Sequence, residues 1–279
     1  MRNLTQDNIT QAVIARMAAT PDPRLKEIMT SLVQHLHAFA REVKLTEAEW
    51  FQGIEFLTRV GHKTDDRRQE FILLSDTLGL SMLTVAMNND KPQGCTESTV
   101  FGPFYVEGAP HFDLGEDVAQ GAAGVPCQVR GTVRGLEGEP VPGAEIHVWQ
   151  ADAEGQYDVQ REGLHRHQAR GVLHADDRGE YRFRSILAEA YPIPDDGPVG
   201  EMLRATKRHP WRPAHLHFMI RAPGYETLIT HVFRAGDPYL DSDAVFGVRQ
   251  SLIAEWKKQP DGVYLVEYDF VLNPDREPH

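Results

Sequence analysis

The sequence has few cysteines, no long apolar run and no excess of positive charge. Its two cysteines, Cys95 and Cys127, cannot form a disulfide framework or a cysteine-rich metal site. Lys and Arg number 29 against 41 Asp and Glu, and the net charge of −12 excludes the basic surface of a nucleic-acid or anionic-membrane binder. The longest weakly polar stretch, residues 77–87, is too short to span a bilayer, and the first residues lack the apolar run of a signal peptide. We therefore expect a cytoplasmic protein with no nucleic-acid and no membrane partner.

The first hundred residues carry the apolar spacing of amphipathic helices. Between positions 25 and 43 apolar side chains recur every three or four residues, which predicts one helix, and positions 8–18 predict a shorter one before it. A capping box formed by Thr46 and Glu49 predicts the start of a third helix. Asp65 and Asp66 precede another periodic run that ends near Val85. Because each stripe is one-sided, we expect these helices to pack on each other, on the rest of the chain or on a partner subunit.

Beyond about residue 97 the apolar period changes to the value of two that is typical of strands. Short alternating runs separated by turn-rich segments indicate an antiparallel β-sandwich. These runs cover residues 129–133, 145–150, 181–186, 215–221, 227–233 and 264–271. Residues 163–179 and 192–213 show no convincing period, and we expect long functional loops there. The predicted fold class is α+β, with a helical domain over residues 1–97 and a β-sandwich over residues 98–279.

The sharpest chemical signal is the pair His215 and His217. On a strand both imidazoles would project from one face, with Leu216 on the other, so that they could reach one metal ion. The alternative is two polar residues on a solvated face. A second pair, His165 and His167, lies among arginines in a predicted loop, and there the solvated interpretation is preferred.

The other ligands of such a metal must be oxygen donors, because no cysteine lies near the histidines. Carboxylates would give an Fe(II) or zinc hydrolase site, whereas tyrosine phenolates would select Fe(III). Tyr157, in a turn-rich loop, and Tyr191, before two prolines, are the candidates. A single tyrosine is more often a packing residue than a ligand, so the residues alone leave the choice open.

Three separated motifs resemble those of the intradiol ring-cleaving dioxygenases. They are TVFGPFY at residues 99–105, GAEIHVWQAD at residues 143–152 leading to Tyr157, and RPAHLH at residues 212–217. Their order and spacing match that family over most of the chain. Three further segments resemble the branch that cleaves hydroxyquinol, with catechol and chlorocatechol 1,2-dioxygenases as near neighbours. They are residues 73–80, 196–200 and 230–233.

The resemblance implies one Fe(III) ion per chain, which binds the diol and primes its ring for O2. The four implied ligands are Tyr157, Tyr191, His215 and His217. By analogy with the family, Tyr191 leaves the metal and takes a substrate proton, and Arg212 stabilises carbanion character on the ring. His231 stands where catechol-cleaving relatives carry Gln, and it is expected to lie near the iron as a marker of the branch.

The resemblance also implies a flat apolar substrate pocket. Its expected lining is Leu73, Asp76, Val100, Phe101, Gly102, Pro103, Phe104, Ile193, Pro194 and Arg212. Asp76 is the polar exception on an apolar helix face, and it would accept a hydrogen bond from the third hydroxyl that hydroxyquinol has and catechol lacks. The alternative is a local cap or salt bridge at Asp76.

The implied reaction is cleavage of hydroxyquinol (benzene-1,2,4-triol) with O2 to 3-hydroxy-cis,cis-muconate, the enol form of maleylacetate. Catechol or chlorocatechol cleavage, a zinc or Fe(II) hydrolase, and a non-catalytic sandwich of the transthyretin-like kind are the rival interpretations. In this family the N-terminal helices join two subunits, so a homodimer is expected, and a phospholipid or fatty acid between the helices is compatible with the residue 25–43 stripe.

Overall fold

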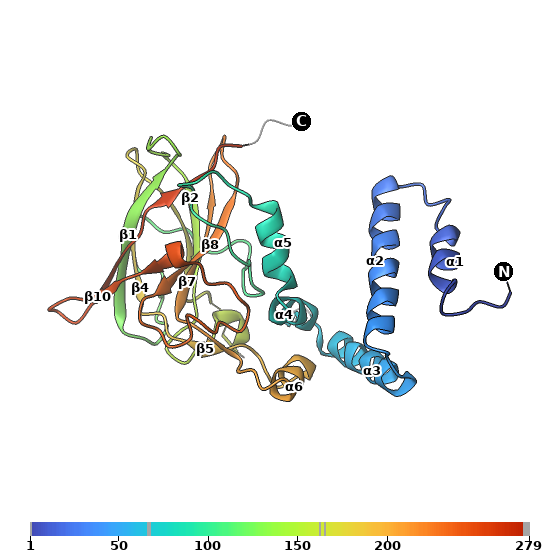
Figure 1. The fold of residues 1–279 in the computed structure, drawn as a ribbon. Coiled ribbons are helices and arrows are strands. Elements are labelled where there is room, and N and C mark those ends of the chain that lie inside the picture. The colour runs from blue at the N-terminus through green and yellow to red at the C-terminus, as the bar shows by residue number, and fades with distance from the viewer. Residues whose placement is uncertain (1, 66–67, 162, 165, 276–279) are drawn as a thin grey trace. The chain divides into compact units, whose positions relative to one another are not determined.

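The computed structural model describes residues 2–65, 68–161, 163–164 and 166–275 (Figure 1). The chain divides into two compact units, Met1–Arg59 and Val60–His279. The first unit is helical, and the second contains further helices and all the described strands.

The first unit is built from three helices, as the periodicity predicts. They are α1 (Ile9–Arg16), α2 (Pro23–Glu42) and α3 (Glu47–Lys63), the last of which runs on into the second unit. Asp22 caps α2 by accepting hydrogen bonds from the backbone of Arg24 (2.8 Å) and Leu25 (3.2 Å). The predicted capping box is confirmed, because Thr46 N donates to Glu49 Oε2 (2.9 Å) and Glu49 N to Thr46 Oγ1 (3.3 Å).

The periodic run before Val85 forms two helices and not one. They are α4 (Glu70–Thr77) and α5 (Leu80–Asn88), bent by 77° at Gly79, whose φ of 76° is in the left-handed region that glycine tolerates. Asp66, which the sequence places at the start of this run, lies outside the described residues. No single described helix is long and apolar enough to cross a membrane, and only the bent pair α4 and α5 meets that criterion jointly.

The second unit is organised around two five-stranded sheets. The first has the order β10-β11-β1-β12, with β4 also paired to β1, and its strands are β1 (Pro126–Arg134), β4 (Glu180–Ile186), β10 (Trp256–Lys258), β11 (Tyr264–Glu267) and β12 (Phe270–Val271). The second has the order β3-β2-β7-β8-β9, and its strands are β2 (Glu145–Trp149), β3 (Arg170–His174), β7 (His215–Arg221), β8 (Leu228–Arg234) and β9 (Ile253–Ala254). A separate short ladder joins β5 (Tyr191–Pro192) to β6 (Trp211–Arg212).

The prediction of a purely antiparallel sandwich is wrong in part. The central pairs β1/β4, β2/β3, β2/β7 and β7/β8 are antiparallel, but β1 pairs in parallel with β11 and β12, and β8 pairs in parallel with β9. The strands β9, β11 and β12 all lie in the last third of the described chain, and each pairs in parallel with a strand that precedes it in the sequence. Alternation of side chains predicts a strand but not the direction of its neighbour.

Aromatic rings from both sheets meet in the core between them. Phe218 of β7 lies 6.4 Å from Phe183 of β4 and 4.7 Å from Phe270 of β12, measured between ring centroids. All three are at most 1% exposed. The apolar face of β7 is therefore occupied by the core, which directs its other face toward the site described below.

Both stretches expected to be loops contain regular structure. Residues 163–179 include β3 (Arg170–His174). Its first two residues hide the alternating pattern of a strand, because Arg170 is charged and Gly171 has no side chain. Residues 192–213 include α6 (Pro198–Ala205) and β6. Val199 N, at the start of α6, donates to the buried carboxylate of Glu70 (3.1 Å), which ties α6 to α4.

Candidate functional site

Two buried histidines project from the same face of β7. His215 is 2% and His217 is 1% exposed, while Leu216 between them packs into the core. In the sheet register His217 stands between Trp149 of β2 and His231 of β8, so these three side chains form one row across three strands. The indole of Trp149 stacks on the His217 imidazole with centroids 4.7 Å apart. The interpretation as a solvated pair is therefore excluded.

Two tyrosines reach the same place from segments outside that sheet. Tyr157 precedes a short 3-10 turn (Asp158–Gln160), and its ring stacks on Phe104 with centroids 4.3 Å apart. Tyr191 begins β5, where it pairs with Arg212. Gly155 allows the two segments to approach, because a Cβ there would lie 2.7 Å from Tyr191 Cβ and its φ of 76° is left-handed.

The polar atoms of these four side chains converge. Tyr157 Oη lies 2.9 Å from His217 Nε2 and 3.3 Å from Tyr191 Oη, and His217 Nε2 lies 3.2 Å from His215 Nε2. All four residues are at most 4% exposed. The structure thus brings together the four side chains that the resemblance selects.

Burial fixes the protonation of this cluster. It lowers the pKa of His215 to about 3, helped by the charge of Arg212, and it lowers the pKa of His217 well below its usual value. Burial, with Tyr191 beside it, raises the pKa of Tyr157 well above its ordinary value. The imidazoles are therefore neutral and can act as ligands, whereas a phenolate at Tyr157 requires a cation next to it.

The four residues fit a metal ion by their geometry. Two ligand atoms each about 2.1 Å from one ion lie about 3.0 to 3.4 Å apart when the angle at the ion is between 90° and 110°. The three separations between these atoms are 2.9, 3.2 and 3.3 Å, of which two lie in that interval and one lies 0.1 Å below it. His215 Nδ1 lies 2.7 Å from the Pro213 carbonyl, which can only accept, so the lone pair of His215 is on the Nε2 that faces the other donors.

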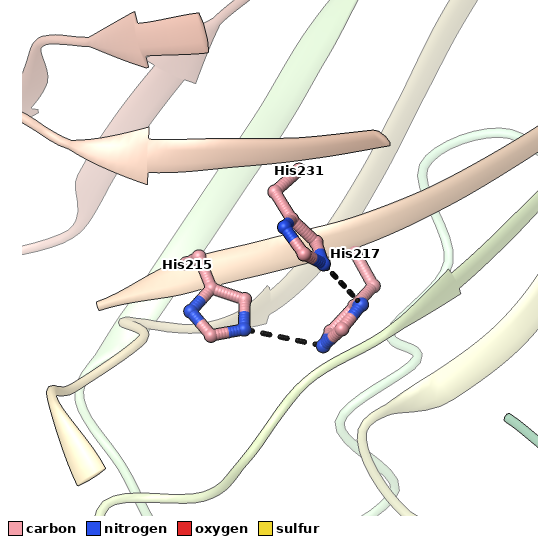
Figure 2. A group of neighbouring side chains, drawn as sticks. All are labelled: His215, His217 and His231. Atoms are coloured by element: carbon pink, nitrogen blue, oxygen red, sulfur yellow. Dashed lines mark hydrogen bonds between the residues drawn. The ribbon is translucent and has the colours of Figure 1, made fainter. Parts of the chain in front are cut away.

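His231 completes a cluster of three buried histidines but is directed differently (Figure 2). Its Nε2 lies 2.8 Å from His217 Nδ1, the nitrogen that points away from the tyrosines, and its Nδ1 lies 2.7 Å from Thr99 Oγ1. Both ring nitrogens of His231 are therefore engaged. With His217 Nε2 free to bind a metal, a proton on His217 Nδ1 is donated to His231, and His231 in turn donates to Thr99.

Arg212 adds a buried positive charge beside the cluster. It is 3% exposed, its Nη1 lies 3.2 Å from His215 Nε2, and the carboxylate of Asp243 binds the other side of its guanidinium. Burial by itself would lower the pKa of Arg212, but the charge and hydrogen bonds of Asp243, together with Tyr191 and Tyr157, outweigh burial and raise this pKa. Arg212 is therefore a buried, ion-paired cation next to the cluster.

Three supporting residues escaped the sequence analysis. Asp243 holds Arg212, as described above. Arg170, in a stretch expected to be a loop, is 2% exposed in β3, pairs with the buried Asp158 and donates to the Phe104 carbonyl (3.0 Å). Thr99, which hydrogen-bonds His231, lies in the motif TVFGPFY. No local sequence pattern distinguishes it from the other residues of that motif.

The residues expected to line the substrate pocket differ in how deeply they are buried. Asp76 is 4% exposed in α4, where burial raises its pKa against the opposing effects of Ser81 and the Arg212 charge. Phe101 lies 5.8 Å from Trp149, and a Cβ on Gly102 would lie 3.4 Å from His217. Leu73, Val100, Phe104 and Ile193 are buried, whereas Pro103 and Pro194 are partly exposed.

The second histidine pair takes no part in this cluster as far as the structure describes it. His165 lies outside the described residues. The side chain of His167 is 40% exposed and lies 3.6 Å from the Asp158 carboxylate.

Comparison with known proteins agrees with this geometry. Residues 100–274 match the family model described as Dioxygenase, and residues 22–96 match Catechol dioxygenase N terminus. The chain is 69% identical to the 6-chlorohydroxyquinol 1,2-dioxygenase of Cupriavidus pinatubonensis over 98% of this chain and 99% of that protein. It is 55% identical to the hydroxyquinol 1,2-dioxygenase of Nocardioides simplex over 92% of this chain and 87% of that protein. The crystal structure of the hydroxyquinol 1,2-dioxygenase from Pseudomonas putida DLL-E4 superposes with a TM-score of 0.90 at 47% identity, over 97% of this chain and 99% of that one.

The α+β fold and the buried cluster of histidines and tyrosines fit a metalloenzyme. The chain belongs to the intradiol dioxygenase family. It is an enzyme of that family, whose members depend on iron and cleave aromatic diols with O2.

Proposed function

We propose that this enzyme cleaves hydroxyquinol between its two adjacent hydroxylated carbons with O2. The product is 3-hydroxy-cis,cis-muconate, the enol form of maleylacetate, which contains all atoms of the triol and of one O2. The proposal rests on the buried, converging side chains Tyr157, Tyr191, His215 and His217, and the buried carboxylate of Asp76 in α4 supports the choice of the triol as substrate. The names of the relatives above support it. A catechol or chlorocatechol substrate is the alternative, and it would offer the Asp76 carboxylate no hydrogen bond beyond the one from Ser81.

Tyr157, Tyr191, His215 and His217 would hold one Fe(III) per chain, because two phenolates and two neutral imidazoles suit a hard trivalent ion. When bound, the ion would accept both oxygens of the diol and withdraw electron density from the ring, so that the substrate reacts with O2. The donor separations described above support this assignment.

The protein side chains provide proton transfer, charge and orientation. Tyr191 Oη takes one hydroxyl proton of the diol. Arg212 Nη1, close to His215, stabilises negative charge that develops on the ring. His231 keeps His217 in one tautomer and orientation through Nε2.

Asp76 accepts the hydrogen bond of the third hydroxyl, and apolar residues hold the flat face of the ring and exclude water. These apolar residues are Leu73, Val100, Phe101, Gly102, Pro103, Phe104, Ile193 and Pro194.

The helical region, residues 1–97, serves as a dimerisation domain in this proposal, and residues 98–279 form the catalytic domain. The two family models, which meet between residues 96 and 100, support this division. Apolar side chains on one stripe of α2 are 46–55% exposed and require a cover: Leu25, Ile28, Leu32, Leu36 and Phe39. The proposed cover is the same region of a second subunit, with a phospholipid or fatty acid between the helices as an additional occupant. The two unpaired thiols, Cys95 and Cys127, support a cytoplasmic location.

The direct test is to measure kcat/KM with O2 for hydroxyquinol, 6-chlorohydroxyquinol, catechol and 4-chlorocatechol, and to identify each product by mass. The proposal predicts that kcat/KM for hydroxyquinol exceeds that for catechol by at least about tenfold, which corresponds to about 1.4 kcal/mol. A preference for catechol or 4-chlorocatechol would replace the proposed substrate with the alternative.

A further inference from the structure

Asp243 binds the Arg212 guanidinium along one edge only. Its Oδ1 accepts from Arg212 Nε (3.0 Å) and its Oδ2 from Arg212 Nη2 (3.2 Å), and both side chains are at most 4% exposed. This two-point contact fixes the plane of the guanidinium. The remaining nitrogen, Nη1, is the one directed at His215 Nε2, 3.2 Å away.

The Asp243 carboxylate is itself held by backbone groups. Oδ1 accepts from the N–H of Val245 (3.3 Å) and Oδ2 from the N–H of Gly247 (2.9 Å). Gly247 fits closely against the pair, because a Cβ there would lie 3.0 Å from Arg212 Nη2 and 3.2 Å from Asp243 Oδ2. The carboxylate is therefore anchored independently of the arginine, and the arginine is oriented by it.

A second carboxylate lies within the electrostatic range of Arg212. The arginine charge lowers the pKa of Asp76, while burial and the charge of Asp243 raise it. A buried arginine without Asp243 would be attracted toward Asp76, since an unpaired buried charge is strongly disfavoured. Asp243 thus keeps Arg212 in place and leaves Asp76 available to another hydrogen-bond donor.

We propose that Asp243 is the positioning residue that holds Arg212 with Nη1 beside His215, at the cluster where the diol ring would bind. The role rests on the proposed function, because Arg212 is assigned to charge stabilisation there. Asp243 hydrogen-bonds Arg212 and the backbone N–H groups of Val245 and Gly247, and we assign its effect on the reaction to the orientation of Arg212. Loss of its charge misplaces the guanidinium and lowers kcat without removing the iron ligands.

The test compares Asp243→Asn with Glu70→Gln in the iron-loaded enzyme. Glu70 is a matched control, because it is also a buried carboxylate bonded to an arginine (Arg68) and to a backbone N–H (Val199). We expect Asp243→Asn to lower kcat for hydroxyquinol about 10- to 100-fold with less change in KM, and with iron content and visible spectrum unchanged. Glu70→Gln should change kcat less than about twofold. Equal losses in the two variants would overturn the proposal.

A double-mutant cycle separates action through Arg212 from any other role. If Asp243 acts only by orienting Arg212, Asp243→Asn causes no further loss of kcat in an Arg212→Gln background. A full additional loss in that background would contradict the proposal. Gly247→Ala provides a second variant that retains both charges, and it should lower kcat by pressing on Arg212 Nη2.

The free energy of unfolding of the metal-free protein tests the coupling of Asp243 and Arg212 without measuring catalytic activity. The variants Asp243→Asn and Arg212→Gln should be non-additive there, because each removes the partner of the other. Additive effects would show that the two side chains are not coupled and would overturn the pairing. If wild-type enzyme fails to cleave hydroxyquinol while the unfolding coupling is present, the proposed function fails and the pairing stands.

Discussion

Tyr157 Oη lies 2.9 Å from His217 Nε2, although the two residues are 60 positions apart and belong to a loop and to strand β7. The contact brings a phenol to a neutral imidazole in a place that water does not reach. A positive ion that replaces the phenol proton would satisfy both atoms. The predictions below concern the residues that support this arrangement and the substrate that it serves.

His231 controls the orientation of His217 through a nitrogen that cannot bind the same metal ion. We predict that His231→Ala weakens iron affinity about 10- to 100-fold, the usual effect of losing the partner of a ligating histidine. His231→Gln, which restores an acceptor at that position, should recover most of the affinity. Iron retention during dialysis against a chelator measures both. Equal iron loss from the Gln and Ala variants would contradict the orienting role.

Asp76 discriminates between substrates by the third hydroxyl. Asp76→Ala should lower kcat/KM for hydroxyquinol at least about tenfold more than for catechol, because only hydroxyquinol loses a hydrogen bond. Asp76→Asn retains an acceptor and should fall between the wild type and Asp76→Ala. Steady-state kinetics with both substrates is the measurement, and an equal loss on the two would assign Asp76 to local structure instead.

The sequence predicts those parts of the molecule whose signal is local. The α2 stripe, the Thr46–Glu49 capping box and the alternation around His215 and His217 each lie within a few turns of chain, and the structure confirms the elements they predict. The convergence of the tyrosines with the histidines depends on resemblance, since nothing in their spacing brings them together.

The pairings of buried charges could not be predicted in this way. Arg212 meets Asp243 across 31 positions and Arg170 meets Asp158 across 12, and a hydropathy pattern assigns such residues to the solvated surface. Their burial follows from their pairing, which only the tertiary structure reveals. The row Trp149, His217 and His231 likewise depends on strand register, which the sequence does not specify.

Cys127 provides a pH-dependent test of the core. It is 1% exposed, and burial raises the pKa of its thiol from 9.0 to about 12. Because the folded pKa is above the unfolded one, the neutral thiol contributes its full stability below about pH 9, and this contribution is lost as the pH rises toward 12. Unfolding measured from pH 8 to pH 11 should show this loss, which is absent in Cys127→Ala. At pH 8 a thiol reagent should reach Cys127 only after denaturation, and rapid labelling in the native protein would contradict this burial.

The exposed stripe of α2 predicts self-association. Light scattering coupled to size exclusion should give twice the 31.4 kDa chain mass. Leu32→Glu together with Leu36→Glu should shift the protein toward one chain, because charge replaces apolar contact area. The solvent-exposed pair Arg24→Glu and Glu27→Arg on the same helix is the control and should leave the mass unchanged. A wild-type mass of one chain would exclude the dimer.

The most direct test of the proposed centre is the visible spectrum of purified protein together with an iron assay, with Tyr157→Phe and the control Tyr181→Phe measured in parallel. Tyr181 is equally buried but donates its hydroxyl to the Tyr268 carbonyl, away from the cluster. The account predicts about one iron per chain, a tyrosinate-to-Fe(III) band that shifts when hydroxyquinol is added without O2, and loss of that band in Tyr157→Phe alone. A protein that stays colourless after loading with ferric iron, or a band that Tyr157→Phe leaves unchanged, would contradict it.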